Sequence, residues 1–225
     1  MGFDRKELKA RAKALLKANY WPMVGAALVL AIVTYAAAAN SGTAQNAEEI
    51  TDEAAYRLTG MLAMLIALAG AAIKIFVFNP LEFGGRRFFV RNIEGQSRDT
   101  LFEGFRTENH MRASLTFLLR DLYILLFTFL LIVPGIIKAY EYYFVPELLS
   151  DHPELNGKDV LDLSKEMTNG MKMELFKLDL SFILWSMLSG ITYNIAGIFF
   201  VFPYKAQTRA LAYAELVDRG ADPAR

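Results

Sequence analysis

The feature that most constrains this chain is an almost continuous apolar stretch over residues 113–150. A helix crosses the hydrocarbon core of a bilayer with about 20 residues, so this stretch is too long for one crossing. Val133, Pro134 and Gly135 interrupt it. Because proline is tolerated in the first turn of a helix and glycine where a chain reverses, these residues predict a tight turn between two spans, 113–133 and 134–150.

Four further apolar stretches predict four more spans, over about 22–39, 58–78, 175–191 and 195–213. The 225 residues are 54% hydrophobic, with a mean hydropathy of +0.27, which is high for a soluble domain. We therefore expect an all-α fold: one membrane domain over 1–225, a polytopic bundle of six helices in three hairpins, with a cytoplasmic tail over 214–225. The stretch 22–39 also has the form of a signal-peptide core, but it is long for one and other spans follow.

The positions of the basic residues favour six spans. With six spans, 20 of the 24 Lys and Arg residues fall in segments on one side of the membrane. A four-span alternative, in which 134–177 lies outside, places five lysines on the other side. Since basic residues accumulate on the cytoplasmic side, we expect a multi-pass protein of a bacterial plasma membrane with both termini in the cytoplasm.

Residues 4–20 predict an amphipathic helix at the cytoplasmic surface. Asp4 can cap it, with Glu7 three residues later, and apolar residues recur at helical spacing. We expect its apolar side to lie in the acyl boundary and its cations to contact anionic headgroups. The apolar residues are Leu8, Ala12, Leu15 and Leu16, and the lysines are Lys6, Lys9, Lys13 and Lys17. Further amphipathic helices are expected at about 99–111, at about 158–172 and after Pro203.

A second candidate headgroup contact is Gly84-Gly85 followed by Arg86 and Arg87. Backbone donors beside two cations could hold a lipid phosphate. The alternative is a flexible break before an interfacial helix.

Three similar hairpins are indicated by an internal repeat. Each outgoing span follows an asparagine, at Asn19, Asn109 and Asn169, and each returning span ends in aromatic residues and a proline. These endings are Phe76-Val77-Phe78-Asn79-Pro80, Tyr143-Phe144-Val145-Pro146 and Phe200-Val201-Phe202-Pro203.

Several motifs resemble the DUF975 family of bacterial integral membrane proteins, from about residue 4 to 216. They are Arg5-Lys6-Glu7-Leu8-Lys9, Pro80-Leu81-Glu82, Leu101-Phe102-Glu103-Gly104-Phe105, Val133-Pro134-Gly135-Ile136-Ile137-Lys138 and Leu163-Ser164-Lys165-Glu166-Met167. The Pro-Gly-Ile turn is also distantly similar to the membrane domain of some glycerophosphodiester phosphodiesterases. The resemblance implies a multi-span membrane protein and transfers no catalytic residue.

The sequence contains no cysteine and two histidines, His110 and His152, which are not in a metal-binding motif. No catalytic signature is present, so we expect no enzyme activity and no cofactor. Charged residues inside predicted spans are costly there and usually face protein or water. They either line a polar path for an anion or proton, or form buried pairs that fix helix register, and we favour the buried pairs. The charged residues concerned are Lys74, Arg120, Asp121, Lys138, Glu141 and Asp179. We expect Lys138 to pair with Glu141, and Arg120 and Asp121 to point to different faces and need partners on other helices.

The leading functional hypothesis is a non-enzymatic membrane scaffold or lipid-interacting module. Its expected partners are membrane lipids with anionic headgroups, not nucleic acid, and a second copy of the chain or another membrane protein is an alternative partner. A small transporter or permease subunit comes second, and an intramembrane enzyme acting on phospholipid headgroups comes third.

Overall fold

The computed structural model describes residues 3–42, 53–96, 100–106, 110–155, 157–192 and 194–221. All regular elements in these ranges are helical, so the predicted all-α class is confirmed. Residues 43–52, which belong to the loop 40–57 that the predicted spans place outside the membrane, and Asn109 are not among the described residues. The helices are α1 (Arg5–Ala18), α2 (Tyr20–Gly42), α3 (Glu53–Ile73), the π-helical η2 (Lys74–Phe78), α4 (Asn79–Ile93), α5 (Glu103–Arg106), α6 (His110–Leu130), α7 (Ile132–Glu141), α8 (Val145–Asp151), α9 (Gly157–Met167), α10 (Lys172–Leu180), α11 (Ile183–Ile191), η3 (Gly197–Val201), α12 (Phe202–Leu216) and η4 (Val217–Ala221).

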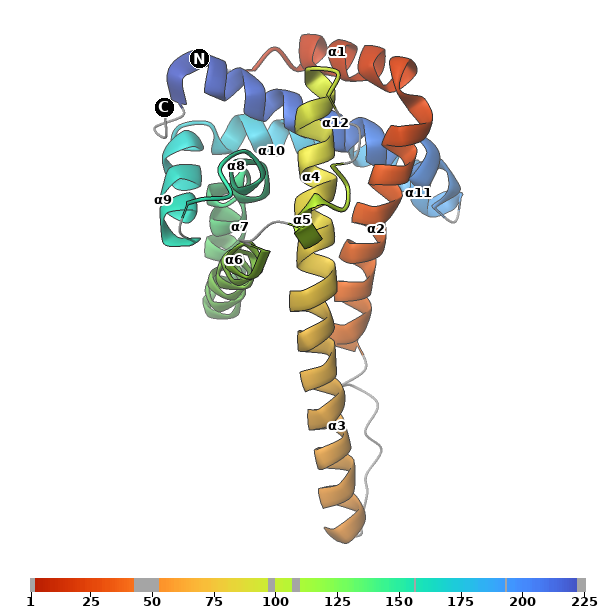
Figure 1. Ribbon diagram of the computed structural model, residues 1–225, viewed down its shortest axis with the longest axis vertical. Helices are drawn as coiled ribbons and strands as arrows, with labels where there is room; N and C mark the ends of the chain where they lie inside the picture. The colour runs from red at the N-terminus through yellow and green to blue at the C-terminus, as the bar shows by residue number, and fades with distance from the viewer. Residues whose placement is uncertain are drawn as a thin grey trace.

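The longest feature is the continuous rod α3–η2–α4, which extends beyond the other helices (Figure 1). Proline cannot donate a backbone hydrogen bond and collides with the carbonyl four residues earlier, so Pro80 would normally kink such a rod. Here the turn before it widens: the N–H of Asn79 donates to the carbonyl of Lys74, five residues back. The same widening precedes Pro203, where the N–H of Phe202 donates to Gly197. Both aromatic-proline endings thus become π-helical turns.

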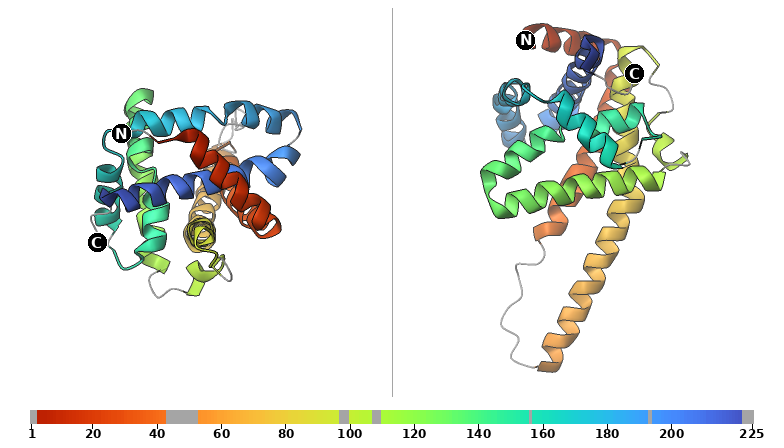
Figure 2. Two further views of the ribbon diagram at one scale, coloured as in Figure 1. Left: turned by 90° about the horizontal axis from the view of Figure 1, so that it is seen from above. Right: turned by 90° about the vertical axis from the view of Figure 1, so that its left-hand side faces the viewer.

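Helices α6 and α7 form a hairpin that runs across the direction of α3–α4 (Figure 2). The chain reverses at Leu131, whose backbone is extended, slightly before the predicted Val133-Pro134-Gly135 turn. Pro134 and Gly135 instead occupy the first turns of α7. A Cβ on Gly135 would lie 2.2 Å from Thr128 Oγ1, so glycine is required by the close approach of α7 to α6.

Two predicted spans are each built from two short helices. The stretch 134–150 contains most of α7 and most of α8, separated by a turn before Pro146, and 175–191 contains most of α10 and all of α11. None of these helices has the roughly 20 residues that a straight crossing needs. The prediction of one continuous helix per span is therefore wrong here, and the count of six crossings stays a prediction.

The N-terminal helix lies on α12 (Figures 1 and 2). Asp4 caps it as predicted, accepting hydrogen bonds from the backbone N–H groups of Lys6 and Glu7. Its apolar residues Leu8, Ala12 and Leu16 are buried in the protein core. This corrects the expectation that the apolar side of residues 4–20 lies in the acyl boundary: another helix of the chain covers that side. The interfacial location of α1 stays a prediction.

A buried chain of amides fixes the corner between α1 and α2. Asn19 donates to Asn92 at 2.8 Å, and Asn92 donates to Gln207 of α12 at 2.9 Å. Gln207 in turn donates to the carbonyl of Phe89. The first asparagine of the repeat therefore joins the N-terminal corner to α4 and α12.

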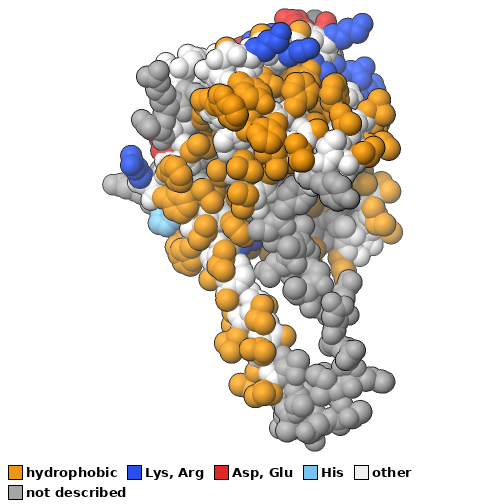
Figure 3. Space-filling view, turned by 90° about the vertical axis from the view of Figure 1, so that its right-hand side faces the viewer, with side chains coloured by type: hydrophobic (Ala, Val, Ile, Leu, Met, Phe, Trp, Pro, Cys, Tyr) orange, Lys and Arg blue, Asp and Glu red, His pale blue; other side chains and the backbone are white. Residues whose placement is uncertain are grey.

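Two described helical stretches, Gly60–Ile93 and His110–Leu130, are long and apolar enough to cross a membrane. A third crossing is counted if the bent pair Arg5–Ala18 and Tyr20–Val33, which meet at 109°, forms one span. Apolar side chains are exposed along α3 and at the tip of the α6–α7 hairpin, where Phe129 is 92% exposed. Hydrophobic atoms also cover much of one broad face of the molecule, with Lys and Arg above them (Figure 3). Such exposure indicates an apolar surrounding.

Candidate functional site

Charged side chains meet between α4, α6, α8, α10 and α12, and we call this group the central charge network. In its first part, Arg120 of α6 lies 3.2 Å from Glu82 of α4 and 2.8 Å from its own neighbour, Asp121. Lys74 of η2 contacts the other carboxylate oxygen of Asp121 at 2.5 Å. Arg120 and Asp121 thus have the partners on other helices that the sequence predicted. They also contact each other, which corrects the expectation that they point apart, because the long arginine side chain folds back.

The second part is centred on Glu147, which is buried in the first turn of α8. Arg209 of α12 holds its carboxylate with Nε at 2.8 Å and a terminal nitrogen at 2.9 Å, and it also donates to the carbonyl of Tyr143. Arg86 of α4 approaches the same carboxylate at 3.6 Å. A buried carboxylate between two guanidinium groups joins three helices from distant parts of the chain.

The third part surrounds Asp179, near the end of α10. Lys205 of α12 lies 3.0 Å from this carboxylate, and the hydroxyls of Tyr140 and Tyr143 donate to it at 3.3 Å. Tyr143 therefore belongs to two parts of the network, through its carbonyl and its hydroxyl.

The predicted pair Lys138–Glu141 is present but lies apart from the central charge network. Lys138 contacts Glu141 at 2.6 Å, and Lys172 contacts its other oxygen at 2.6 Å. The carbonyl of Glu141 accepts hydrogen bonds from Ser164 and Thr168 of the α9 region. These contacts attach the end of α7 to α9 and α10.

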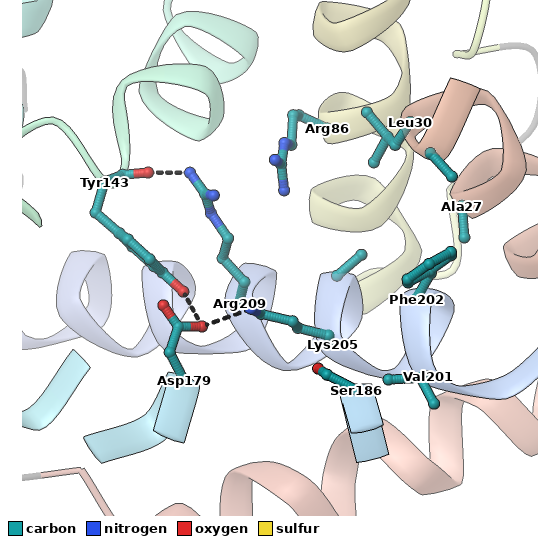
Figure 4. A pocket seen from close by; sticks show the side chains of 12 residues that line it. Ala27, Leu30, Arg86, Tyr143, Asp179, Ser186, Val201, Phe202, Lys205 and Arg209 are labelled. Carbon is teal, nitrogen blue, oxygen red and sulfur yellow. Dashed lines mark hydrogen bonds and ion pairs between the residues drawn. The ribbon is translucent and has the colours of Figure 1, made fainter. Parts of the chain in front are cut away.

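Two cavities adjoin the central charge network and share Arg86, Tyr143 and Arg209 as lining residues. One cavity, of about 310 Å³, lies between α2, α4, α10, α11 and α12 (Figure 4). We call it the α2–α12 cavity. The other, of about 340 Å³, is lined by the Lys74, Glu82, Arg120 and Asp121 cluster. Within the described residues, no group of three or more His, Asp or Glu side chains is arranged to hold a metal ion.

The predicted headgroup contacts separate into two groups. Lys6, Lys13 and Lys17 are exposed on the side of α1 away from its buried apolar residues. Lys9 instead turns inward, donating to the carbonyl of Ser181 at 3.1 Å and lying over the Phe182 ring.

The remaining two predicted headgroup contacts, Arg86 and Arg87, face the protein. Arg86 belongs to the central charge network, and Arg87 contacts Glu103 at 2.8 Å. Gly84 and Gly85 are neither an exposed phosphate cradle nor a break, because both are buried inside α4. A Cβ at Gly84 would lie 1.9 Å from the carbonyl oxygen of Leu101, so this glycine permits close packing of the chain against α4.

Sequence reasoning missed Glu82, Glu147 and Arg209 as members of this site. The repeat contains a signal for them: Arg86 and Arg209 each stand six residues after the proline of their repeat, Pro80 and Pro203. Glu147 directly follows the third proline, Pro146. Each proline lies in the first turn of α4, α8 or α12, so the repeat fixes where these charges stand on the three packed helices.

Comparison with known proteins gives one finding. Residues 122–220 match the family described as protein of unknown function (DUF975). No curated protein and no solved structure gives a significant match to this chain. The distant similarity to glycerophosphodiester phosphodiesterase membrane domains stays a prediction. The matched stretch begins in α6 and includes Glu147, Asp179 and Arg209 of the central charge network. Over residues 122–220 this chain is therefore similar to the DUF975 family, whose function is unknown.

Proposed function

We propose that this protein is a non-enzymatic integral membrane module of a bacterial plasma membrane that binds anionic lipids, with α1 on the cytoplasmic surface. The observation that carries the proposal is the arrangement of α1. Its apolar residues are covered by α12, whereas Lys6, Lys13 and Lys17 are exposed on the outer side. The helix thus presents cations to its surroundings from a fixed position on the protein.

Electrostatics supports this use of α1. A Lys or Arg near an anionic leaflet contributes about 1 kcal/mol of binding free energy. Trp21, directly after α1, is 71% exposed, and tryptophan prefers the headgroup level of a membrane. The exposed lysines therefore stand beside a residue suited to that level, and the apolar exposed residues Leu28 and Ile32 of α2 follow.

The test uses Trp21 as a reporter in liposomes that contain the full chain. The sequence has two tryptophans, so Trp185→Phe leaves Trp21 as the single one. Dibromo-phosphatidylglycerol is expected to quench Trp21 more strongly than dibromo-phosphatidylcholine. Lys13→Gln with Lys17→Gln should remove this preference, whereas the control Lys158→Gln with Lys165→Gln, two exposed lysines of α9, should retain it. Equal quenching by the two lipids in the unsubstituted lysine background would contradict the proposal.

A second candidate function is movement of a small anion. The observation that favours it is that two cavities meet at the same three residues, Arg86, Tyr143 and Arg209. If this function is the right one, proteoliposomes should show anion flux that is lost when Arg120 and Asp121 are both replaced by leucine. A folded double variant with unchanged flux would exclude this path.

A further inference from the structure

The central charge network has one more cation than carboxylates. Among the described residues its cations are Lys74, Arg86, Arg120, Lys205 and Arg209, and its carboxylates are Glu82, Asp121, Glu147 and Asp179. A charge taken out of water without a partner is strongly unfavourable, and arginine keeps its proton in proteins. An extra anion would therefore stabilise the network.

The surplus charge belongs to Arg86. Lys205 pairs with Asp179, and Arg209 occupies both oxygens of Glu147. Arg86 is left with a loose approach of 3.6 Å to that already occupied carboxylate. Its Nε is buried and has no hydrogen-bond partner in the part of the chain that the structure describes. The Nε of Arg209 also makes no hydrogen bond there, but it lies 2.8 Å from an oxygen of Glu147, whereas no carboxylate lies that close to Arg86. A buried guanidinium donor without an acceptor is unfavourable, so this group marks where an acceptor is needed.

The α2–α12 cavity provides space for that acceptor. Arg86 from α4 points toward it, and Lys205 from α12 lines it with its ammonium group directed at Asp179, as Figure 4 shows. Its volume of about 310 Å³ is several times the roughly 30 Å³ that a water molecule occupies in the liquid. The other side of the cavity is apolar and consists of Ala27 and Leu30 of α2 with Val201 and Phe202.

This division into a cationic side and an apolar side matches an amphiphile with a charged head. Exposed apolar residues lie on two of the helices that border the cavity, Leu28 and Ile32 on α2 and Leu184 and Met187 on α11. A hydrocarbon chain that leaves the cavity can remain in contact with such residues. A free inorganic anion would use the cationic side alone.

We propose that the α2–α12 cavity binds the phosphate group of one anionic phospholipid, with Arg86 as its main ligand and Lys205 as the second cation. This inference rests on the proposed lipid-binding function and gives it a specific site. A lipid with a net negative charge compensates Arg86, whereas a zwitterionic lipid brings no net charge. The cavity therefore prefers phosphatidylglycerol to phosphatidylcholine.

The test measures lipid retained by the full chain after purification in detergent. Native mass spectrometry and thermal unfolding are followed while phosphatidylglycerol is added. The wild-type protein should bind about one lipid and unfold at a higher temperature. Arg86→Gln should weaken binding about tenfold or more, because hydrogen bonds to charged groups are lost. The control Arg91→Gln, on the same helix and paired with exposed Glu94, should bind like the wild type.

A second pair of variants tests the cavity without changing charge. Ala31→Phe fills the α2–α12 cavity and should abolish retention, whereas Leu28→Phe, on the exposed side of α2, should not. Lipid-free Arg86→Gln should be no less stable than lipid-free wild type, because the substitution removes the uncompensated charge. This last result separates a ligand-binding arginine from a purely structural one, whose loss would destabilise the protein.

Other outcomes overturn the cavity site or the role of α1. Equal lipid retention by wild type and Arg86→Gln, or retention by neither, excludes the site. If inorganic phosphate alone raises the unfolding temperature as much as the lipid does, and Arg86→Gln removes that effect, the occupant is a free anion. If the Trp21 quenching test fails but lipid retention still depends on Arg86, only the role of α1 is rejected. If the quenching test succeeds but lipid retention does not depend on Arg86, only the cavity site is rejected.

Discussion

At the residue scale, the clearest requirement is the glycine at position 84. A methyl group there would collide with the backbone carbonyl of Leu101, which cannot rotate away as a side chain can. We expect Gly84→Ala to lower the unfolding free energy by about 1–3 kcal/mol through overpacking. Gly25 of α2, whose Cβ would meet nothing within 4 Å, is the matched control. Gly25→Ala should leave stability unchanged or raise it by up to about 1 kcal/mol.

Thermal unfolding of the two alanine variants in the same detergent provides the measurement. Equal midpoints for both would show that the chain near Leu101 is free to move away from α4. The comparison isolates packing, because both positions are helical and receive the same added atom.

Individual residues could be predicted from sequence where their partners are local. The cap at Asp4 and the pair Lys138–Glu141 depend on neighbours three residues or fewer apart, and both are present. Glu82 and Glu147 could not be assigned, because their partners come from helices far along the chain. Gly84-Gly85 was misread because glycine permits both a break and close helix packing, and only the neighbouring chain decides between them.

At the element scale, Glu147 connects α8 to α4 and α12. Glu147→Gln would leave Arg86 and Arg209 in the interior without this carboxylate. Removing one partner of a buried ion pair typically costs about 3–5 kcal/mol, so we expect a large fall in the unfolding temperature. Glu174→Gln, which breaks a partly exposed pair with Lys177 within one helix, should change that temperature far less. Similar midpoints for the two variants would mean that water reaches Glu147 freely.

The pair Arg120 and Asp121 tests whether intraspan charges are structural. Arg120→Leu alone removes the guanidinium that contacts both Glu82 and Asp121 and leaves both carboxylates in place. Replacing Arg120 and Asp121 together removes one charge of each sign. The double variant should therefore unfold at a higher temperature than Arg120→Leu, and a double-mutant cycle measures the coupling. Additive effects would show that the two side chains do not interact.

Element boundaries were predictable where apolar runs are long and less so near prolines. α6 ends close to the predicted position, and α1 begins at its predicted cap. The π-helical turns before Pro80 and Pro203 have no signal distinct from an ordinary proline kink. The splitting of 134–150 and 175–191 into short helices has no signal in their apolar content, which continues across both breaks.

At the scale of the whole molecule, the contact of α1 with α12 limits the topology. The guanidinium of Arg219, just after α12, lies 5.9 Å from the centre of the ring of Phe3, just before α1. These two contacting residues lie on the same side of a membrane, so the chain between them crosses an even number of times. Two, four and six crossings satisfy this condition. Apolar content alone could not decide the number, because it identifies segments suited to a membrane and not their orientation.

Labelling of single introduced cysteines can decide the number of membrane crossings, because the chain contains no cysteine of its own. Cysteines at the exposed positions Lys13 and Asp218 should react alike with a membrane-impermeant maleimide. Both should be protected in intact cells and labelled after lysis. A cysteine at Glu48, in the segment predicted to lie outside, should be labelled in intact cells. The six-span topology protects a cysteine at Lys158, whereas the four-span alternative exposes it. Labelling of only one of the cysteines at Lys13 and Asp218 in intact cells would contradict the packing of α1 on α12. It would also contradict the basic surface on which lipid binding by α1 depends.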